Sequence, residues 1–211
     1  MAELDLDATA STGIVQPVVG VSASFVDLDK RLKTKDDTGF IRNASTFMNF
    51  STGPQTPAAA TRTYLVGSQV AVPAGKLQVG TMFRWTFNMT KTAAGVAAST
   101  VDIAVGVAGT VADTAQVAFT KPGGTAVADE AKVVIEAIVR SIGAAGVMVG
   151  EFSLIHNLAA TGHALVPCVV VNTVSAGFDM TVASLFVGLC ITSGAADAIT
   201  VQQVLTEVFN L

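Results

Sequence analysis

The stretch Thr81–Thr90, TMFRWTFNMT, constrains the fold more than any other part of the chain. Within it, two sets of side chains alternate: Phe83, Trp85, Phe87 and Met89 with Arg84, Thr86, Asn88 and Thr90. Successive side chains of a β-strand point to opposite faces. A period of two, with aromatic residues in one phase and polar residues in the other, therefore predicts a strand that is buried on one face.

The same period recurs along the rest of the chain. In TVDIAVG, Val101, Ile103 and Val105 share one face. In the segment AKVVIEAIVR, one face is expected to point inward and the other outward. The inward face holds Val133, Ile135, Ala137 and Val139, and the outward face holds Lys132, Glu136 and Arg140. In VMVGEFSLIHN, one face holds Met148, Phe152, Leu154 and His156. Leu185–Ile191, LFVGLCI, is apolar in both phases, as in a strand that is buried on both sides.

The final segment, Ile199–Leu211, permits two interpretations. Its apolar residues also suit one face of a helix: Val201, Val204, Leu205, Val208 and Phe209. Its β-branched and aromatic pieces, ITV and EVF, favour a strand. Since every periodic segment before it is β-like, we predict a strand here too.

Short turn sequences separate these segments, and no long helical pattern lies between them. Examples are Pro73–Gly75, Pro122–Gly124 and the hairpin turn SIGAAG at Ser141–Gly146. Strands at this spacing favour an antiparallel sandwich or barrel over a parallel sheet. We therefore predict an all-β chain whose residues 62–211 form an antiparallel jelly-roll sandwich, because a last strand at the extreme C-terminus is compatible with that topology.

The first 61 residues have a different character. They contain the charged piece LDKRLKTKDD and then all but the last two residues of the Ser/Thr/Pro/Ala-rich piece NASTFMNFSTGPQTPAAATRT. Such composition is typical of linkers, so we predict an extended N-terminal arm over residues 1–61 that is ordered mainly by a partner. Its candidate partner-binding residues are Phe40, Phe47, Met48 and Phe50, because buried aromatic anchors dominate interface energy. The equal alternative is that these four side chains close the protein's own core.

Low charge is the main compositional feature. The chain is 51% hydrophobic and 13% charged, whereas about 25% is usual. Either the core is large or much surface is buried against other subunits, and we favour the second interpretation.

The run Lys91–Asp113, KTAAGVAASTVDIAVGVAGTVAD, could be membrane-spanning, disordered or β-structure. No apolar run reaches the roughly 18 residues of a membrane helix, and disordered chains are poor in Val, Ile and Phe; we predict strand–turn–strand and no membrane partner.

The distribution of charge argues against nucleic acid as a partner. The net charge is −4, and no Lys or Arg follows Arg140. Nucleic-acid binding requires clustered positive charge. In LDKRLKTKDD, the densest basic stretch, acids alternate with bases, which is typical of a solvated face. The acidic N-terminus, MAELDLDATASTG, does not resemble a secretory signal.

Residues with catalytic chemistry are few. His156 lies in phase with core residues and is expected to be hydrogen-bonded inside or at an interface, whereas His163 is expected in an exposed loop. A zinc site made by His156, His163 and Cys168 is an alternative, but its spacing fits no common pattern. Cys168 and Cys190 are predicted as buried thiols, with a bridge between them possible if their strands pair.

Catalytic motifs are absent from the sequence. It contains no G-x-S-x-G elbow, P-loop or G-x-G-x-x-G. Asp129–Glu130 precedes a predicted strand and suggests a solvated loop, and the other acids are too scattered to define a facing carboxylate pair. We therefore predict a protein that is not an enzyme, with no catalytic residue, no cofactor and no metal site.

Three segments resemble a group of tailed-bacteriophage virion proteins. They read YLVGSQVAVPAGKLQVGTMFRWTFNMTKTAAGVAAST, ADTAQVAFTKPGGTAVADEAKVVIEAIVR and GEFSLIHNLAATGH, within a resemblance that covers roughly Tyr64–Leu211. The resemblance implies a jelly-roll domain, usually trimeric, on the outside of a phage particle, with an N-terminal part that anchors it to capsid or tail. It transfers no functional residues to this chain.

Three classes of function follow as hypotheses. The first is a capsid decoration, cement or head-fibre protein, made in the host cytoplasm and placed on the capsid surface of the virion. Its partners would be its own copies, as a homotrimer, and the major capsid protein or another virion protein, reached through the arm. The second is a tail-fibre or receptor-binding protein that recognises the host surface. The third is an enzyme, such as a depolymerase or a cupin-like metal protein, which the missing His/Glu constellation disfavours.

Overall fold

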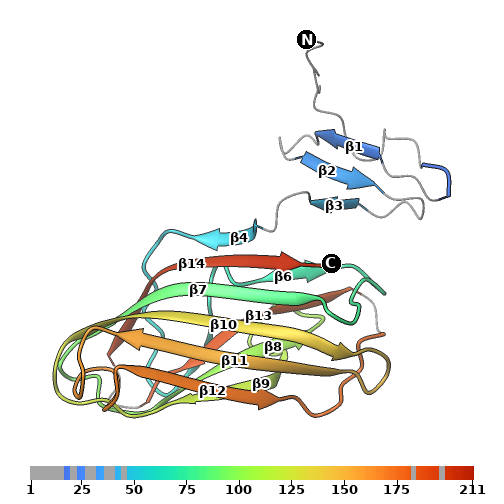
Figure 1. Cartoon of the computed structure of the whole chain (residues 1–211). Helices are drawn as coiled ribbons and strands as arrows, with labels where there is room; N and C mark the ends of the chain where they lie inside the picture. Colours follow the sequence, from blue (N-terminus) through green and yellow to red (C-terminus); the bar gives the residue numbers. More distant parts are fainter. Residues whose placement is uncertain are drawn as a thin grey trace, which may run out of the picture. The chain divides into compact units, whose positions relative to one another are not determined.

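The computed structural model describes residues 17–19, 23–26, 32–35, 41–43, 47–181, 184–194 and 198–211. Within these ranges it contains strands and no helix, and the predicted all-β class is confirmed. The strands, labelled in Figure 1, are β1 Ala23–Val26, β2 Leu32–Lys35, β3 Ile41–Asn43, β4 Phe47–Ser51, β5 Arg62–Tyr64, β6 Val70–Val72, β7 Met82–Lys91, β8 Ser99–Gly106, β9 Thr114–Lys121, β10 Asp129–Ser141, β11 Val147–His156, β12 Cys168–Val174, β13 Leu185–Thr192 and β14 Ile199–Phe209.

The chain divides into two compact units, Met1–Thr46 and Phe47–Leu211. The first contains a three-stranded antiparallel sheet in the order β1-β2-β3, with Lys33 of β2 opposite Phe25 of β1. The second is a sandwich that begins before the expected position 62. The linker-like residues 47–61 belong to it because β4 pairs with β14, and the backbones of Gln55 and Val201 exchange two hydrogen bonds of 2.7 and 2.8 Å.

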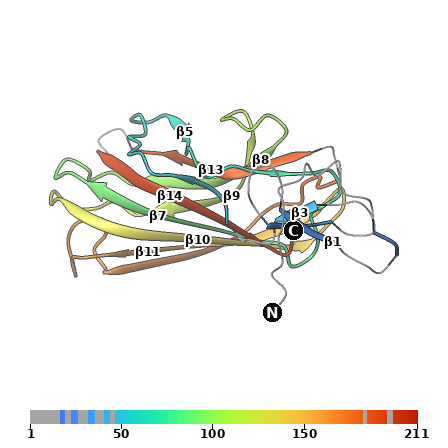
Figure 2. The same cartoon turned by 90° about the horizontal axis from the view of Figure 1, so that it is seen from above.

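Two antiparallel sheets form the layers of the sandwich, as Figure 2 shows from above. The larger sheet has six strands in the order β12-β11-β10-β7-β14-β4. The smaller has the order β5-β13-β8-β9, and β6 also pairs with β13. Each sheet therefore has one face that packs against the other sheet and one face that points outward.

The strand pairs of the sandwich are nested in the sequence. β7 pairs with β14, β8 pairs with β13, and β10 pairs with β11. Between these pairs, β9 of the smaller sheet contacts β12 of the larger, where the Thr173 hydroxyl donates to the Ala118 carbonyl at 3.3 Å. Segments distant in sequence are therefore neighbours, and the two sheets meet along the β9–β12 edge.

The core lies between the sheets and contains the predicted alternating residues. Phe83, Trp85 and Phe87 are fully buried, and the Phe83 and Trp85 rings stack at 5.7 Å between centroids. The Trp85 indole donates to the Ser68 carbonyl at 2.8 Å, so its polar atom is also satisfied. From the neighbouring strands the core receives the predicted inward set Val133, Ile135, Ala137, Val139, Met148, Phe152 and Leu154.

The C-terminal segment is a strand, as predicted. β14 lies between β7 and β4, and Val201, Val204 and Val208 point into the core. Its pairing with β7 shifts between Val201 and Gln203, which marks a β-bulge at Gln202. A helix here would leave the adjacent edges of β7 and β4 without the partner that β14 supplies.

Candidate interaction surface

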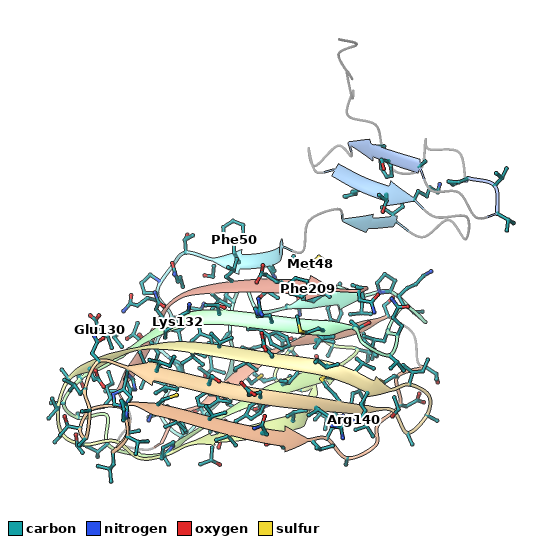
Figure 3. All side chains as sticks on the ribbon, in the orientation of Figure 1. Met48, Phe50, Glu130, Lys132, Arg140 and Phe209 are labelled. Atoms are coloured by element: carbon teal, nitrogen blue, oxygen red, sulfur yellow. The ribbon has the colours of Figure 1, made fainter. Side chains whose placement is uncertain are left out.

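The four candidate partner-binding residues have different positions. Phe40 lies outside the described residues. Phe47 begins β4, where its backbone pairs with Glu207, and its side chain is not described. Met48 is half-buried and packs against the core, which fits the alternative that it closes the protein's own fold. Phe50 is 51% exposed and projects outward from β4 (Figure 3), as a partner-binding side chain would.

Phe50 borders an open hollow of about 500 Å³ at the sandwich edge. Its lining is Asn49, Phe50, Tyr64, Leu65, Val66, Gly67, Gln69, Gly109, Thr110 and Val111. The side chains of Phe50, Val66 and Val111 are exposed there. We call this feature the edge hollow. Its apolar rim is of the kind that marks contact with another macromolecule.

The first wall of the edge hollow is the loop Leu65–Gln69, which is held rigidly over β4. Gly67 has a φ of 85°, and a Cβ there would overlap the backbone of Phe50. The Thr206 hydroxyl donates to the Gly67 carbonyl at 2.7 Å. Glycine at this position therefore permits both the left-handed backbone and the close approach.

The second wall is the loop Val107–Asp113, which is held by an ion pair between the partly exposed Arg62 and the buried Asp102. Arg62 of β5 binds the Asp102 carboxylate of β8 through Nε at 3.0 Å, and its Nη1 donates to the carbonyls of Val111 and Asp113 at 2.6 and 2.7 Å. The hydrogen bond to Asp102 raises the pKa of the Arg62 guanidinium. One side chain thus joins a strand of the smaller sheet to the loop above it.

Cys190 lies beneath this cover and Tyr64 forms part of it, and burial keeps both side chains protonated. Burial raises the pKa of the Tyr64 hydroxyl to about 12 and that of the Cys190 thiol to about 12. A thiol in this state is a poor nucleophile, and the prediction that Cys190 is a buried thiol is confirmed. The prediction for Cys168 is wrong: it is exposed at the start of the edge strand β12, and both cysteines are free.

A buried polar cluster closes one end of the sandwich. It contains Asp129 at the start of β10, His156 at the end of β11, and His163 in the following loop. The Asp129 carboxylate lies 2.6 Å from His156 Nδ1 and accepts the backbone N–H groups of His163 and Glu130 at 2.9 and 2.8 Å. Burial opposes the charge of Asp129, but these hydrogen bonds lower its pKa overall.

The cluster confirms one sequence expectation and corrects two. His156 is buried and hydrogen-bonded, as predicted. Its Nε2 lies 2.6 Å from the Val166 carbonyl, so both ring nitrogens contact an oxygen atom. His163 is fully buried rather than exposed, and Asp129 is buried rather than in a solvated loop, because residues 157–167 fold back over the sandwich end.

His163 is neutral inside this cluster. Burial is the largest cause that lowers its pKa, to about 4, and the charge of Lys121 adds to the effect. Neither ring nitrogen has a hydrogen-bond partner among the described residues. The neutral imidazole therefore occupies space in the interior and is not an acid or base in contact with solvent.

The described residues do not form the zinc alternative. No group of three His, Cys, Asp or Glu side chains among them could hold a metal ion. Both nitrogens of His156 already contact acceptors, and Cys168 lies at the surface. No helix in the described part of the chain is long and apolar enough to cross a membrane.

The comparisons with known proteins add little to this geometry. No protein-family model and no curated protein match the chain. Among solved structures, it is similar to a legume lectin-like domain from Entamoeba histolytica at 9% identity and a TM-score of 0.22, over 75% of this chain and 89% of that one. A TM-score this low leaves function to be argued from the residues of this chain.

Proposed function

We propose that the protein is a non-enzymatic structural component of a bacteriophage virion. It decorates or cements the capsid surface as an oligomer, a homotrimer, and attaches to the major capsid protein or another virion protein through its N-terminal region and the β4 edge. The resemblance to tailed-phage virion proteins supports the class. The nested strand pairs support the jelly-roll topology that the resemblance implies.

One observation carries the interaction role: the apolar edge hollow with Phe50 exposed at its rim. The walls of the hollow are fixed by Arg62 and Gly67, so it would present the same shape to each partner without reorganisation. The low charge of the chain agrees with extensive contact between subunits.

The location of the protein on purified particles tests the class. The exposed Cys168 offers a thiol for a maleimide-linked gold label, while the buried Cys190 is expected to stay unlabelled. Label over the heads of particles is the expected result. Label confined to a fibre tip would contradict decoration and support the receptor-binding alternative, and particles without any of the protein would contradict both.

A single substitution tests the edge hollow. Phe50→Asp in the full chain should abolish attachment to particles that lack the protein, because it places a charge in an apolar contact. Val174→Asp is the matched control, since Val174 is similarly exposed, at 53%, on the edge strand β12. Equal attachment of both variants in a sedimentation assay would contradict this role for Phe50.

The N-terminal unit is tested by deletion. Removal of Met1–Thr46 leaves the strand pairing of the sandwich complete, so a folded oligomer that binds particles weakly is expected. Deletion to residue 61 would also remove β4 and is expected to destabilise the sandwich. Full attachment of the shorter deletion would show that the first 46 residues are not an anchor.

A further inference from the structure

A second hollow lies on the outer face of the six-stranded sheet. Its volume is about 470 Å³, and it is lined by Asn88, Met89, Thr90, Glu130, Ala131, Lys132, Ile155, His156, Asn157 and Gln202. Glu130 and Lys132 mark its end of β10, and Arg140 marks the opposite end of the strand (Figure 3). We call this feature the amide hollow, because it contains three carboxamide side chains.

Strand register assembles the amide hollow from four strands. Lys132 of β10 lies opposite Asn88 of β7 on one side and Ile155 of β11 on the other. One pair further along, Glu130 lies opposite Thr90. Side chains directly opposite on one face are close enough to contact the same ligand. The two members of each opposite pair are more than 20 positions apart along the chain, and the pairing of the strands brings them together.

The bulge in β14 supplies the fourth side. In a regular strand, one of two consecutive residues points inward. Here Gln202 and Gln203 are both exposed, because the register shift turns both to the outer face beside Asn88. The Gln202 side chain is oriented by its Nε2, which donates to the Thr90 hydroxyl at 3.0 Å. Bulges of this kind often direct side chains into sites.

The polar atoms of the amide hollow are available to a ligand. Among the described residues, the side chains of Asn88, Glu130, Lys132 and Asn157 show no hydrogen bond to one another or to a neighbour. Each carboxamide offers two donor hydrogens and an acceptor oxygen, the ammonium donates and the carboxylate accepts. The single positive and single negative charge cancel, so the hollow favours neither an anion nor a cation.

We propose that the amide hollow binds a neutral saccharide of one or two residues. Neighbouring sugar hydroxyls each donate and accept, which matches a set of carboxamides flanked by an ammonium and a carboxylate. Ile155, 59% exposed, offers an aliphatic surface to the C–H face of a sugar ring. The volume lies within the range of roughly 300–1,000 Å³ that is usual for ligand pockets.

The affinity of one site should be low, and an oligomer would increase it. The hollow has no aromatic side chain, so a single hexose is expected to bind with a Kd on the order of 1 mM. Several copies on one particle would raise the apparent affinity for a carbohydrate-coated surface through effective concentration. This inference does not depend on attachment to a capsid, since the edge hollow and the amide hollow have different residues.

The full-length protein is titrated with glucose, galactose, mannose and N-acetylglucosamine, and binding is followed by saturation-transfer NMR and by backbone amide shifts. Saturable binding of at least one sugar is expected, with shifts at Asn88, Lys132 and Gln202. Asn88→Ala and Gln202→Ala should each weaken it by about tenfold or more, as expected for the loss of about 1.4 kcal/mol. Both positions are exposed, so unchanged melting temperatures should accompany the loss.

Asn172→Ala is the matched control, because Asn172 is an exposed carboxamide on the same outer face but outside the amide hollow. It should bind the sugar as the unaltered protein does. Absence of binding by all four sugars at 100-fold the expected Kd would overturn the proposal. Binding that persists in both hollow variants, or equal shifts with an acidic peptide at the same residues, would also overturn it.

Discussion

The outward faces of the two sheets differ in what covers them. On the smaller sheet, Asp102, Ala104 and Cys190 point outward and are nevertheless buried, because Arg62, Tyr64 and the loop Val107–Asp113 lie over them. On the larger sheet, the outward side chains of Ile138, Val170, Val174 and Leu205 are exposed. Figure 2 shows β5 beside β13 on the covered side.

This difference shows two ways to place apolar and polar groups on the outside of a sandwich. The covered face tolerates a buried carboxylate because the chain itself supplies Arg62 as a partner. The open face keeps its charges in solvent, where Arg84 and Glu136 remain over a third exposed, and leaves aliphatic side chains between them. Polar groups under a cover should therefore be far more sensitive to substitution than those on the open face.

The largest expected effect comes from breaking the ion pair under the cover. Arg62→Met leaves the Asp102 carboxylate buried without its partner, and two loop carbonyls lose their donor. The free energy of unfolding should fall by about 3–5 kcal/mol, as measured by urea denaturation. The double variant Arg62→Met/Asp102→Leu should recover much of the loss. A fall below about 1 kcal/mol for the single variant would mean that the cover does not desolvate Asp102.

The buried His163 should give a pH-dependent loss of similar size. Its folded pKa of about 4 lies below its ordinary value of 6.5, so folding favours the neutral ring. This stability is fully present above about pH 6.5 and is lost as pH falls towards 4, by about 3 kcal/mol in total. In His163→Leu that loss should be absent, because the ring nitrogens make no hydrogen bond in the described structure. Urea denaturation of the unaltered protein and of His163→Leu at pH 7 and pH 4.5 measures the difference. An equal loss of stability in both proteins would contradict the prediction.

A smaller loss should follow from adding one methyl group beneath the cover. A Cβ at Gly188 of β13 would overlap the Tyr64 hydroxyl, so Gly188→Ala should cost about 1–3 kcal/mol. Gly53→Ala is the control, because nothing lies within 4 Å of a Cβ there. Melting temperatures of the two variants test the difference, and equal values would show that Tyr64 moves aside freely.

The smallest effect is expected on the open face. Arg84 binds Glu136 through Nε at 2.6 Å and lies 5.6 Å from the Phe209 ring centroid. Exposed ion pairs contribute about 0–1 kcal/mol, so Arg84→Met should change the free energy of unfolding by no more than that. A loss as large as that of Arg62→Met would remove the distinction between the two faces, and would indicate that this face is buried in an oligomer.

Sequence reasoning located the strands because their signal is local. The side-chain period of two reads directly from Phe83, Trp85 and Phe87, whatever the rest of the chain does. It could not place residues 47–61, whose Ser/Thr/Pro-rich sequence resembles a linker. These residues are held in place by backbone pairing with Val201 and Ser193, which lie more than 130 positions further along the chain.

The functional regions were harder to predict for the same reason. His163 was expected in solvent because its own segment, LAATGHA, is loop-like, but its burial depends on Asp129 and Thr125. Cys168 begins a strand with an apolar sequence, and it is exposed because it belongs to the outward-facing set of the edge strand β12. Of the two hollows, the edge hollow was indicated in part by Phe50. Only the register of β7, β10, β11 and β14 reveals the amide hollow.

The nested order of the strands also bears on how the chain is made. β7, with its four buried large apolar side chains, leaves the ribosome more than 100 residues before its neighbour β14 is synthesised. Pairings at such separation form slowly, and unpaired apolar strands are prone to aggregate meanwhile. The sandwich can therefore close only after β14 has been synthesised, and a product that stops before Ile199 lacks the strand that links β7 to β4.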